Sequence, residues 1–186
     1  MSASGAVYSG RQRLLHWLMA LMLASLILAV EIKGEFAKGD PRIGQLMIWH
    51  KQVGLWVLVL VWFRLYWRYT QSMPEIIPPL SRLVRLGAQG MHVLLYLMMI
   101  GIPLLGILFS QAKGKLIDFM GIPLPLLLDE STGLPYALSL KSLHQWLGNA
   151  LIYLIVIHAL FALFHHWIRR DNTLTRMLGF RRAVAQ

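Results

Sequence analysis

Histidines are the residues of this chain with the clearest capacity for chemistry. Seven are present, and an ionisable side chain inside a membrane helix is costly, so each one in an apolar stretch indicates a function. His144 and His158 stand 14 residues apart in one apolar stretch. This spacing is close to four helical turns, so both face the same way, about 21 Å apart along the axis. Such a distance excludes one shared metal ion and suits two flat cofactors stacked across a membrane.

Each such cofactor needs a second ligand at a matching depth, and two further histidines supply it. His16 stands near the start of the first apolar stretch and His50 near the start of the second. Because consecutive membrane helices run in opposite directions, we expect His16 to pair with His158 on the inner side and His50 with His144 on the outer side. Two bis-imidazole sites joined by a common helix are what two b-type haems require.

Other metal chemistry fits this pattern less well. Zinc takes four protein ligands in a structural site and three in a catalytic one, whereas only two histidines stand at each level. The chain has no cysteine, which excludes disulfides, iron–sulfur clusters and covalent haem attachment. The alternative for these histidines is hydrogen bonding between helices, which membrane bundles also use.

His92 competes with His16 for the inner site, because the third apolar stretch also begins on the inner side. A porphyrin beside a helix needs small side chains near the ligand, but Tyr96 follows four residues after His92. We therefore favour His16 and expect His92 to pack beside the inner haem or to form hydrogen bonds within the bundle. Small residues stand four positions after each favoured ligand, namely Ala20, Gly54, Gly148 and Ala162.

The two remaining histidines, His165 and His166, stand together next to Trp167. Basic residues follow directly, at Arg169 and Arg170. This composition is typical of a membrane interface, so we expect both imidazoles to be hydrated interfacial side chains.

The elements that position these histidines are membrane helices. The chain has 186 residues, of which 57% are apolar and only 14% charged, and its mean hydropathy is +0.58. Soluble domains carry about 25% charged residues. We predict an all-α, integral membrane four-helix bundle forming one domain over residues 1–186. The four stretches long enough to span a bilayer cover about residues 14–30, 46–63, 86–109 and 140–168.

The predicted outer loop covers residues 110–139 and contains a shorter apolar segment. This segment, residues 116–128, holds Pro123 and Pro125. It is too short to span a bilayer, and proline interrupts helices. We expect it to lie at the membrane surface.

The distribution of charge predicts the orientation. With alternate loops on opposite sides, one side holds 11 cations against two acids and the other holds seven cations against six acids. The positive-inside rule therefore predicts that both termini lie in the cytoplasm. The basic excess thus reports topology and does not indicate a nucleic-acid partner. The cations of the inner side are Arg11, Arg13, Arg64, Arg68, Arg82, Arg85, Arg169, Arg170, Arg176, Arg181 and Arg182.

Short motifs in this sequence resemble the bacterial cytochrome b561 family. The resemblance covers about residues 11–177, and its specific parts are the four histidines and the segment after the fourth apolar stretch. Its motifs are Leu-His-Trp at 15–17, Trp-His at 49–50 before Gly54, Arg-Leu at 64–65, Pro-Glu-Ile-Ile-Pro at 74–78, Ser-Leu-Lys-Ser at 139–142, His-His-Trp at 165–167 and Arg-Asp-Asn-Thr-Leu at 170–174.

The resemblance implies a function for the two haems. It implies a superoxide oxidase of the bacterial inner membrane, which passes electrons from superoxide at the periplasmic face through the haems to ubiquinone. Carried over by position, the iron ligands are His16 and His158 for the inner haem and His50 and His144 for the outer haem, which agrees with the assignment from spacing.

Cationic residues suit the substrates that the resemblance implies. Lys51 and Lys141 stand near the outer ligands and are candidates for steering the superoxide anion. Arg13 and Arg64 are candidates for pairing with inner haem propionates or for closing a quinone site, as is Arg68. Each of these cations could alternatively serve only as an interfacial side chain or as a topology signal.

A rival function uses the same cofactors. A cytochrome b subunit that anchors a dehydrogenase or hydrogenase partner would pass that partner's electrons to quinone. A haem protein with only a structural or assembly role is a third reading. Membrane lipid is a partner in all three, and a protein partner is expected only in the rival one.

Overall fold

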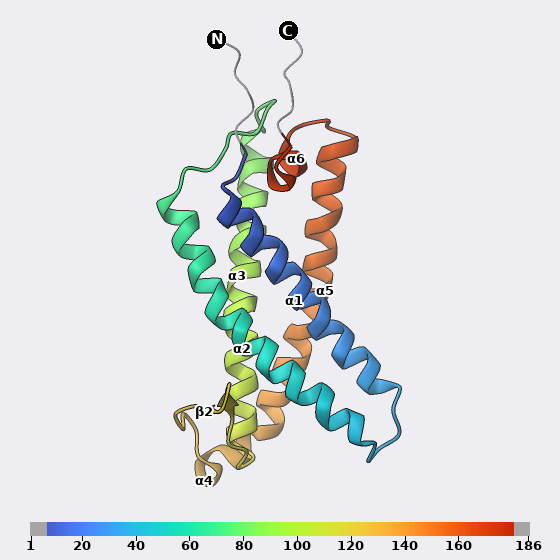
Figure 1. Ribbon diagram of the computed structural model, residues 1–186, viewed down its shortest axis with the longest axis vertical. Helices are drawn as coiled ribbons and strands as arrows, with labels where there is room; N and C mark the ends of the chain where they lie inside the picture. The colour runs from blue at the N-terminus through green and yellow to red at the C-terminus, as the bar shows by residue number, and fades with distance from the viewer. Residues whose placement is uncertain (1–6, 181–186) are drawn as a thin grey trace.

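Four long helices dominate the computed structural model, which describes residues 7–180 (Figure 1). They are α1 (Gly10–Gly34), α2 (Pro41–Thr70), α3 (Arg82–Gln111) and α5 (Ala137–Trp167). All four are long and apolar enough to cross a membrane, which confirms the prediction of four spanning helices. Each begins a few residues before the corresponding apolar stretch, because helical hydrogen bonding continues into the more polar residues at the membrane surface.

Local sequence explains where the first two helices begin. At α1, the Ser9 side chain accepts a hydrogen bond from the Gln12 backbone, and the Gln12 side chain accepts one from the Ser9 backbone. This reciprocal arrangement is a capping box. At α2, the Asp40 carboxylate accepts from the Arg42 backbone N–H, and Pro41 occupies the first helical position, where its missing N–H carries no penalty.

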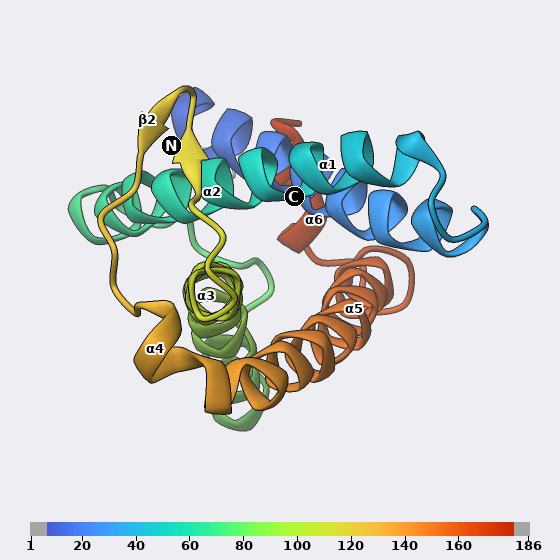
Figure 2. The same ribbon diagram turned by 90° about the horizontal axis from the view of Figure 1, so that it is seen from below.

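The helices form two layers (Figure 2). Helix α1 lies along α2, while α3 lies along α5, and α2 also contacts α3. A cluster of buried side chains packs where α1, α2 and α3 meet. Many outward-facing side chains are large and apolar, including Leu14, Leu21 and Tyr153, each 70% exposed. Lipid covers such a surface at low cost. The cluster consists of Leu15, Met19, Val57, Val61, Tyr96 and Met99.

The outer loop packs against the first half of α2 and the end of α3. It contains a two-stranded antiparallel hairpin, β1 (Asp118–Phe119) and β2 (Ile122–Pro123), followed by α4 (Glu130–Gly133) and the 3-10 turn η1 (Leu134–Tyr136). The Gln111 side chain, 1% exposed, donates to the carbonyl of Pro125 and accepts from the N–H of Leu127. Because one buried amide satisfies several backbone groups, the loop has a defined path.

The hairpin is anchored to α2 beside the outer histidine. The Gln52 side chain donates to the Asp118 carbonyl at 2.9 Å and accepts from the Met120 N–H at 3.2 Å. The Trp56 and Phe119 rings pack edge to face, 5.0 Å apart. The hairpin therefore closes over the outer end of the bundle near His50.

The first and last segments of the described residues meet at the opposite end of the bundle. The short helix α6 (Thr173–Leu178) returns from the end of α5 to the start of α1 (Figure 1), and the Tyr8 N–H donates to the Arg176 carbonyl. The start of α1, the end of α2, the start of α3 and the end of α5 thus share this arginine-rich end. Arg181 and Arg182, which also contributed to the charge argument, lie outside the described residues.

The expectation that His165 is a hydrated interfacial side chain is wrong. His165 is buried, at 7% exposed, and its Nδ1 lies 2.5 Å from a carboxylate oxygen of Asp171. The turn after α5 brings Asp171 back against the end of that helix. Because Asp171 lies beyond the helix, helical periodicity does not predict its contact with His165. Burial raises the pKa of Asp171, but hydrogen bonds from His165 and Thr173 outweigh it, so this pKa is lowered from its usual value.

Candidate functional site

The outer site is formed by two imidazoles facing each other between α2 and α5. The ring centroids of His50 and His144 are 6.2 Å apart, with the ring planes at 72°. A metal–imidazole bond is about 2 Å long and a ring nitrogen lies about 1.1 Å from its centroid, so two imidazoles on opposite sides of one metal have centroids about 6 Å apart. The observed spacing therefore suits two imidazoles that would hold one metal between them.

A third helix orients the His144 ring. His144 Nδ1 lies 2.9 Å from the carbonyl oxygen of Ile102 on α3. Because a carbonyl can only accept, Nδ1 carries the hydrogen and Nε2 keeps the lone pair that binds a metal. This approach depends on Gly106, since a Cβ at that position would lie 3.2 Å from His144 Cε1. Sequence reasoning missed both α3 residues, because no pattern in the chain links them to His144.

The inner site repeats this geometry at the other end of α5. The ring centroids of His16 and His158 are 6.4 Å apart, again the spacing of two ligands on one metal. An open cavity with about 740 Å³ of empty space adjoins both rings, and Ala20 and Ala24 line it. The mostly apolar walls of this space suit a flat macrocycle between the helices.

Arg64 contacts the inner pair directly. Its Nη2 donates to His16 Nδ1 at 2.9 Å, and its Nε donates to the Tyr96 hydroxyl at 3.1 Å. In this arrangement a neutral His16 carries its hydrogen on Nε2. A His16 that held a metal at Nε2 would carry its hydrogen on Nδ1, and Arg64 would then donate to another acceptor.

His92 also reaches the inner site, but its geometry differs from that of a ligand. Its ring centroid lies 5.3 Å from that of His158, which is shorter than the spacing of about 6 Å for two imidazoles on opposite sides of one metal. His92 Nδ1 lies 2.6 Å from the Ala88 carbonyl oxygen in its own helix, so Nε2 keeps the lone pair. These distances favour His16 over His92 as the partner of His158.

Small residues leave clearance beside three of the candidate ligands. Ala20 lines the inner cavity and Gly54 lines the outer one. A Cβ at Gly54 or at Gly148 would meet no atom within 4 Å. The small residues four positions after these histidines thus face open space or a cavity.

The two candidate lysines differ in placement. The outer cavity has about 330 Å³ of empty space, and Lys51 lines it together with His50 and His144. Lys141 lies on α5, one turn before His144, and is exposed. Lys51 therefore stands at the wall of the outer site, whereas Lys141 stands on the surface near it.

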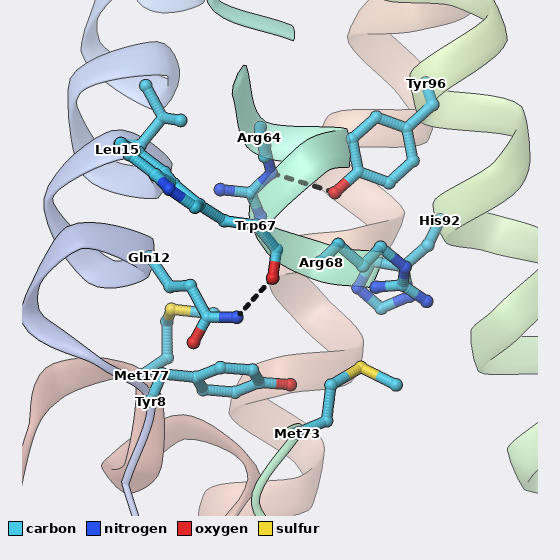
Figure 3. A pocket seen from close by; sticks show the side chains of 10 residues that line it. All are labelled: Tyr8, Gln12, Leu15, Arg64, Trp67, Arg68, Met73, His92, Tyr96 and Met177. Atoms are coloured by element: carbon cyan, nitrogen blue, oxygen red, sulfur yellow. Dashed lines mark hydrogen bonds between the residues drawn. The ribbon is translucent and has the colours of Figure 1, made fainter. Parts of the chain in front are cut away.

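The three candidate arginines also differ in their surroundings. Arg64 lines the inner cavity, and Arg68 lines an adjoining pocket at the arginine-rich end (Figure 3). The guanidinium of Arg13 instead lies against Gly179 beyond α6. Sequence spacing placed all three at one depth, but helix rotation determines which of them face the bundle interior.

Comparison with known proteins places this architecture in a family. A family model described as prokaryotic cytochrome b561 matches residues 7–180. The chain is 34% identical to cytochrome b561 homolog 1 of Escherichia coli K12 over 94% of its length and 98% of that protein. It is 33% identical to the probable superoxide oxidase CybB of Yersinia pestis, over 94% and 97% of the two chains. For cytochrome b561 homolog 2 of Escherichia coli K12 the identity is 32%, over 88% and 87%.

The family and the geometry agree on the class of protein. Within residues 7–180, no group of three or more His, Cys, Asp or Glu side chains could hold a metal ion, whereas paired imidazoles suit haem iron. Three of the four apolar helices of spanning length, α1, α2 and α5, carry these pairs. The chain belongs to the prokaryotic cytochrome b561 family and is a multi-pass bacterial membrane protein that transfers electrons by means of b-type haem.

Proposed function

We propose that this protein is a superoxide:ubiquinone oxidoreductase with two b-type haems. His50 and His144 would hold the iron of the outer haem, and His16 and His158 that of the inner haem. The observation that carries this proposal is the presence of two imidazole pairs, 6.2 and 6.4 Å between centroids, at opposite ends of one helix.

The proposed reaction has a simple balance. Two superoxide anions are oxidised to two molecules of oxygen, and one ubiquinone takes the two electrons together with two protons to become ubiquinol. Bound haem supplies reversible one-electron redox chemistry, which bridges a one-electron donor and a two-electron acceptor. The name of the Yersinia pestis relative, a probable superoxide oxidase, supports this choice of donor.

Lys51 and Lys141 have the proposed role of attracting superoxide. Local positive charge raises the encounter rate of an anion with a site. Lys51 lines the cavity between the outer imidazoles, so its charge acts close to where the electron is donated. Lys141 adds a second cation at the surface near His144.

Arg64 has the proposed role of binding a propionate of the inner haem. Guanidinium groups pair with carboxylates through two parallel hydrogen bonds, and Arg64 lies in contact with His16, where it would be within reach of a haem held by that histidine. Arg13 is proposed as a weaker contributor of positive charge at this end, since its guanidinium lies against Gly179.

The proposed location is the bacterial inner membrane, with both termini in the cytoplasm. The arginine-rich end, where α1 begins and α5 ends, is then cytoplasmic, in keeping with the positive-inside rule. The hairpin and the outer histidine pair face the periplasm, so superoxide formed outside meets His50 and His144 first.

A stopped-flow experiment with purified, haem-loaded protein tests this function. Superoxide is mixed with the protein and a short-chain ubiquinone analogue, and superoxide loss and quinol formation are followed by absorbance. We expect loss far faster than spontaneous dismutation and one quinol formed for every two superoxide anions. Protein without quinone and quinone without protein are the controls.

Two results would contradict the proposal. One haem per chain in a pyridine haemochrome assay would exclude the paired sites. Two haems with no acceleration over spontaneous dismutation would favour the rival function, an electron-relay subunit for a dehydrogenase or hydrogenase partner.

A further inference from the structure

The hairpin of β1 and β2 contacts α2 inside the apolar stretch of that helix, away from its first residues (Figure 1). Gln52 forms hydrogen bonds with the backbone of Asp118 and Met120, and Trp56 packs on Phe119. The apolar stretch begins at about residue 46. At 1.5 Å per residue, Gln52 lies about 9 Å along the helix axis from that point. These contacts therefore hold the hairpin at the depth of the outer boundary of the bilayer.

The inner face of the hairpin segment packs between α2 and α3. Ile117 forms one buried cluster with Leu55 of α2 and Ile107 of α3, and Phe119 and Leu124 pack against this cluster. Ile117 also lines the outer cavity. The hairpin segment is therefore part of the wall that separates the outer cavity from the surface of the bundle.

The opposite face of the same segment is apolar and exposed. Leu116 is 80% exposed, Met120 68% and Ile122 69%. Neighbouring side chains of an extended segment point to opposite faces, so these residues point outward where Ile117 and Phe119 point inward. A single exposed apolar side chain is ordinary. Several in one short segment instead mark a surface that meets lipid or another protein.

Polar groups of the hairpin have partners, as a position in lipid requires. The Gln52 amide both donates to and accepts from the hairpin backbone. The Leu124 N–H donates to the Ile117 carbonyl at 2.8 Å, and the Gly121 N–H donates to the Asp118 carboxylate at 3.2 Å. These hydrogen bonds lower the cost of placing the turn against hydrocarbon.

The charge at the start of the segment suits a phospholipid partner. Lys113 and Lys115 stand directly before the exposed apolar side chains and are exposed themselves. Lysine lays its apolar stem along lipid and keeps its ammonium group at the headgroups. Symmetric pairing of this face with a second copy would instead bring like charges together, which is unfavourable. The combination of cations and apolar side chains therefore favours lipid as the occupant.

We propose that the hairpin inserts its outer face into the outer leaflet of the membrane. Acyl chains of phospholipids pack against Met120 and Ile122, and headgroup phosphates lie near Lys113 and Lys115. The lipid-covered surface of α2 thus continues onto the hairpin. Lipid pressing on this outer face keeps Ile117 in the wall of the outer cavity. The inference does not depend on which molecules give and take the electrons.

Cysteine accessibility tests this insertion, because the chain has no cysteine of its own. The full, haem-loaded Met120→Cys and Ile122→Cys variants are reconstituted into vesicles of phosphatidylcholine and phosphatidylglycerol. A membrane-impermeant maleimide is added outside, and the labelling rate is followed by mass spectrometry. A thiol in lipid ionises less and meets less reagent, so both variants react about tenfold or more slowly than a thiol in water.

Two reference variants set the scale of the labelling rates. Lys38→Cys, at an exposed position between α1 and α2, gives the rate in water on the same side and the fraction of chains facing outward. Tyr153→Cys, at a position of α5 that is 70% exposed, gives the rate in lipid. Labelling of the Met120 and Ile122 variants within tenfold of the Lys38 variant overturns the proposal.

Photochemical cross-linking identifies what covers the hairpin. A benzophenone maleimide is attached to the Met120→Cys variant before reconstitution, and irradiation adds the mass of a phospholipid to the chain. The same reagent on the Lys38→Cys variant gives no such adduct. Cross-linked pairs of chains in place of lipid adducts assign the face to a second copy and overturn the choice of lipid.

Discussion

The His144 ring lies against Gly106 of the neighbouring helix and donates from Nδ1 to the Ile102 carbonyl at 2.9 Å. One residue without a side chain thus allows α3 to orient an imidazole of α5. Such an interaction fixes the tautomer of a ligating histidine and raises its basicity.

The Gly106 contact predicts a selective effect on the outer haem. Gly106→Val places side-chain atoms where the His144 ring lies and weakens its hydrogen bond to Ile102. We expect a shifted midpoint potential or partial loss of one haem, measured by redox titration and pyridine haemochrome assay. Gly101→Val in the same helix is the control, because a Cβ there meets nothing within 4 Å. Equal effects of the two variants would contradict this role.

Single histidine replacements should remove one haem at a time. His50→Ala or His144→Ala should lower the haem content from two to one per chain, and His16→Ala or His158→Ala should do the same at the other site. His92→Ala should keep both, because its ring is closer to His158 than two imidazoles on opposite sides of one iron would be. Loss of a haem in the His92 variant together with retention in the His16 variant would reverse the assignment.

Lys51 should control the rate with superoxide. Replacement of Lys51 by Ala should lower the second-order rate constant about two- to fivefold, and by Glu further, because one nearby charge changes the encounter rate of an anion. Added salt should reduce the difference between the wild type and the variant. Lys38→Ala, which removes a cation remote from the cavity lining, should leave the rate constant unchanged.

Asp171 should contribute pH-dependent stability. The pKa of Asp171 is lowered in the fold because hydrogen bonds from His165 and Thr173 outweigh burial. The stabilisation of the fold by Asp171 is therefore fully present above the pKa of this residue in the unfolded chain, about 4. It is lost as the pH falls through the lower pKa that Asp171 has in the folded protein. At pH 7, Asp171→Asn should lower the thermal midpoint in detergent by about 6 °C or more, as for a broken buried pair.

A thermal scan at several pH values checks this expectation. The difference between the wild type and Asp171→Asn should shrink as the pH is lowered below about 4. Asp118→Asn, a change at an exposed hairpin carboxylate, should have little effect at any pH. A difference that persists unchanged in acid would contradict the electrostatic origin.

The four helices and the depths of the histidines were predictable from sequence. Apolar length defines a spanning helix, and the 14-residue spacing of His144 and His158 places them on one face, since both depend only on the local geometry of a helix. The sequence also favoured His16 over His92 as a ligand. Tyr96 stands four residues after His92, whereas a small residue stands four positions after each candidate ligand.

Tertiary structure alone decided which side chains face one another across the bundle. The Arg64 contact with His16, the packing of Arg13 against Gly179 and the burial of His165 by Asp171 all join residues far apart in the chain or across a turn. These contacts depend on how each helix is rotated about its axis and where loops return to it. Packing between helices sets both, and no periodicity within one segment encodes them.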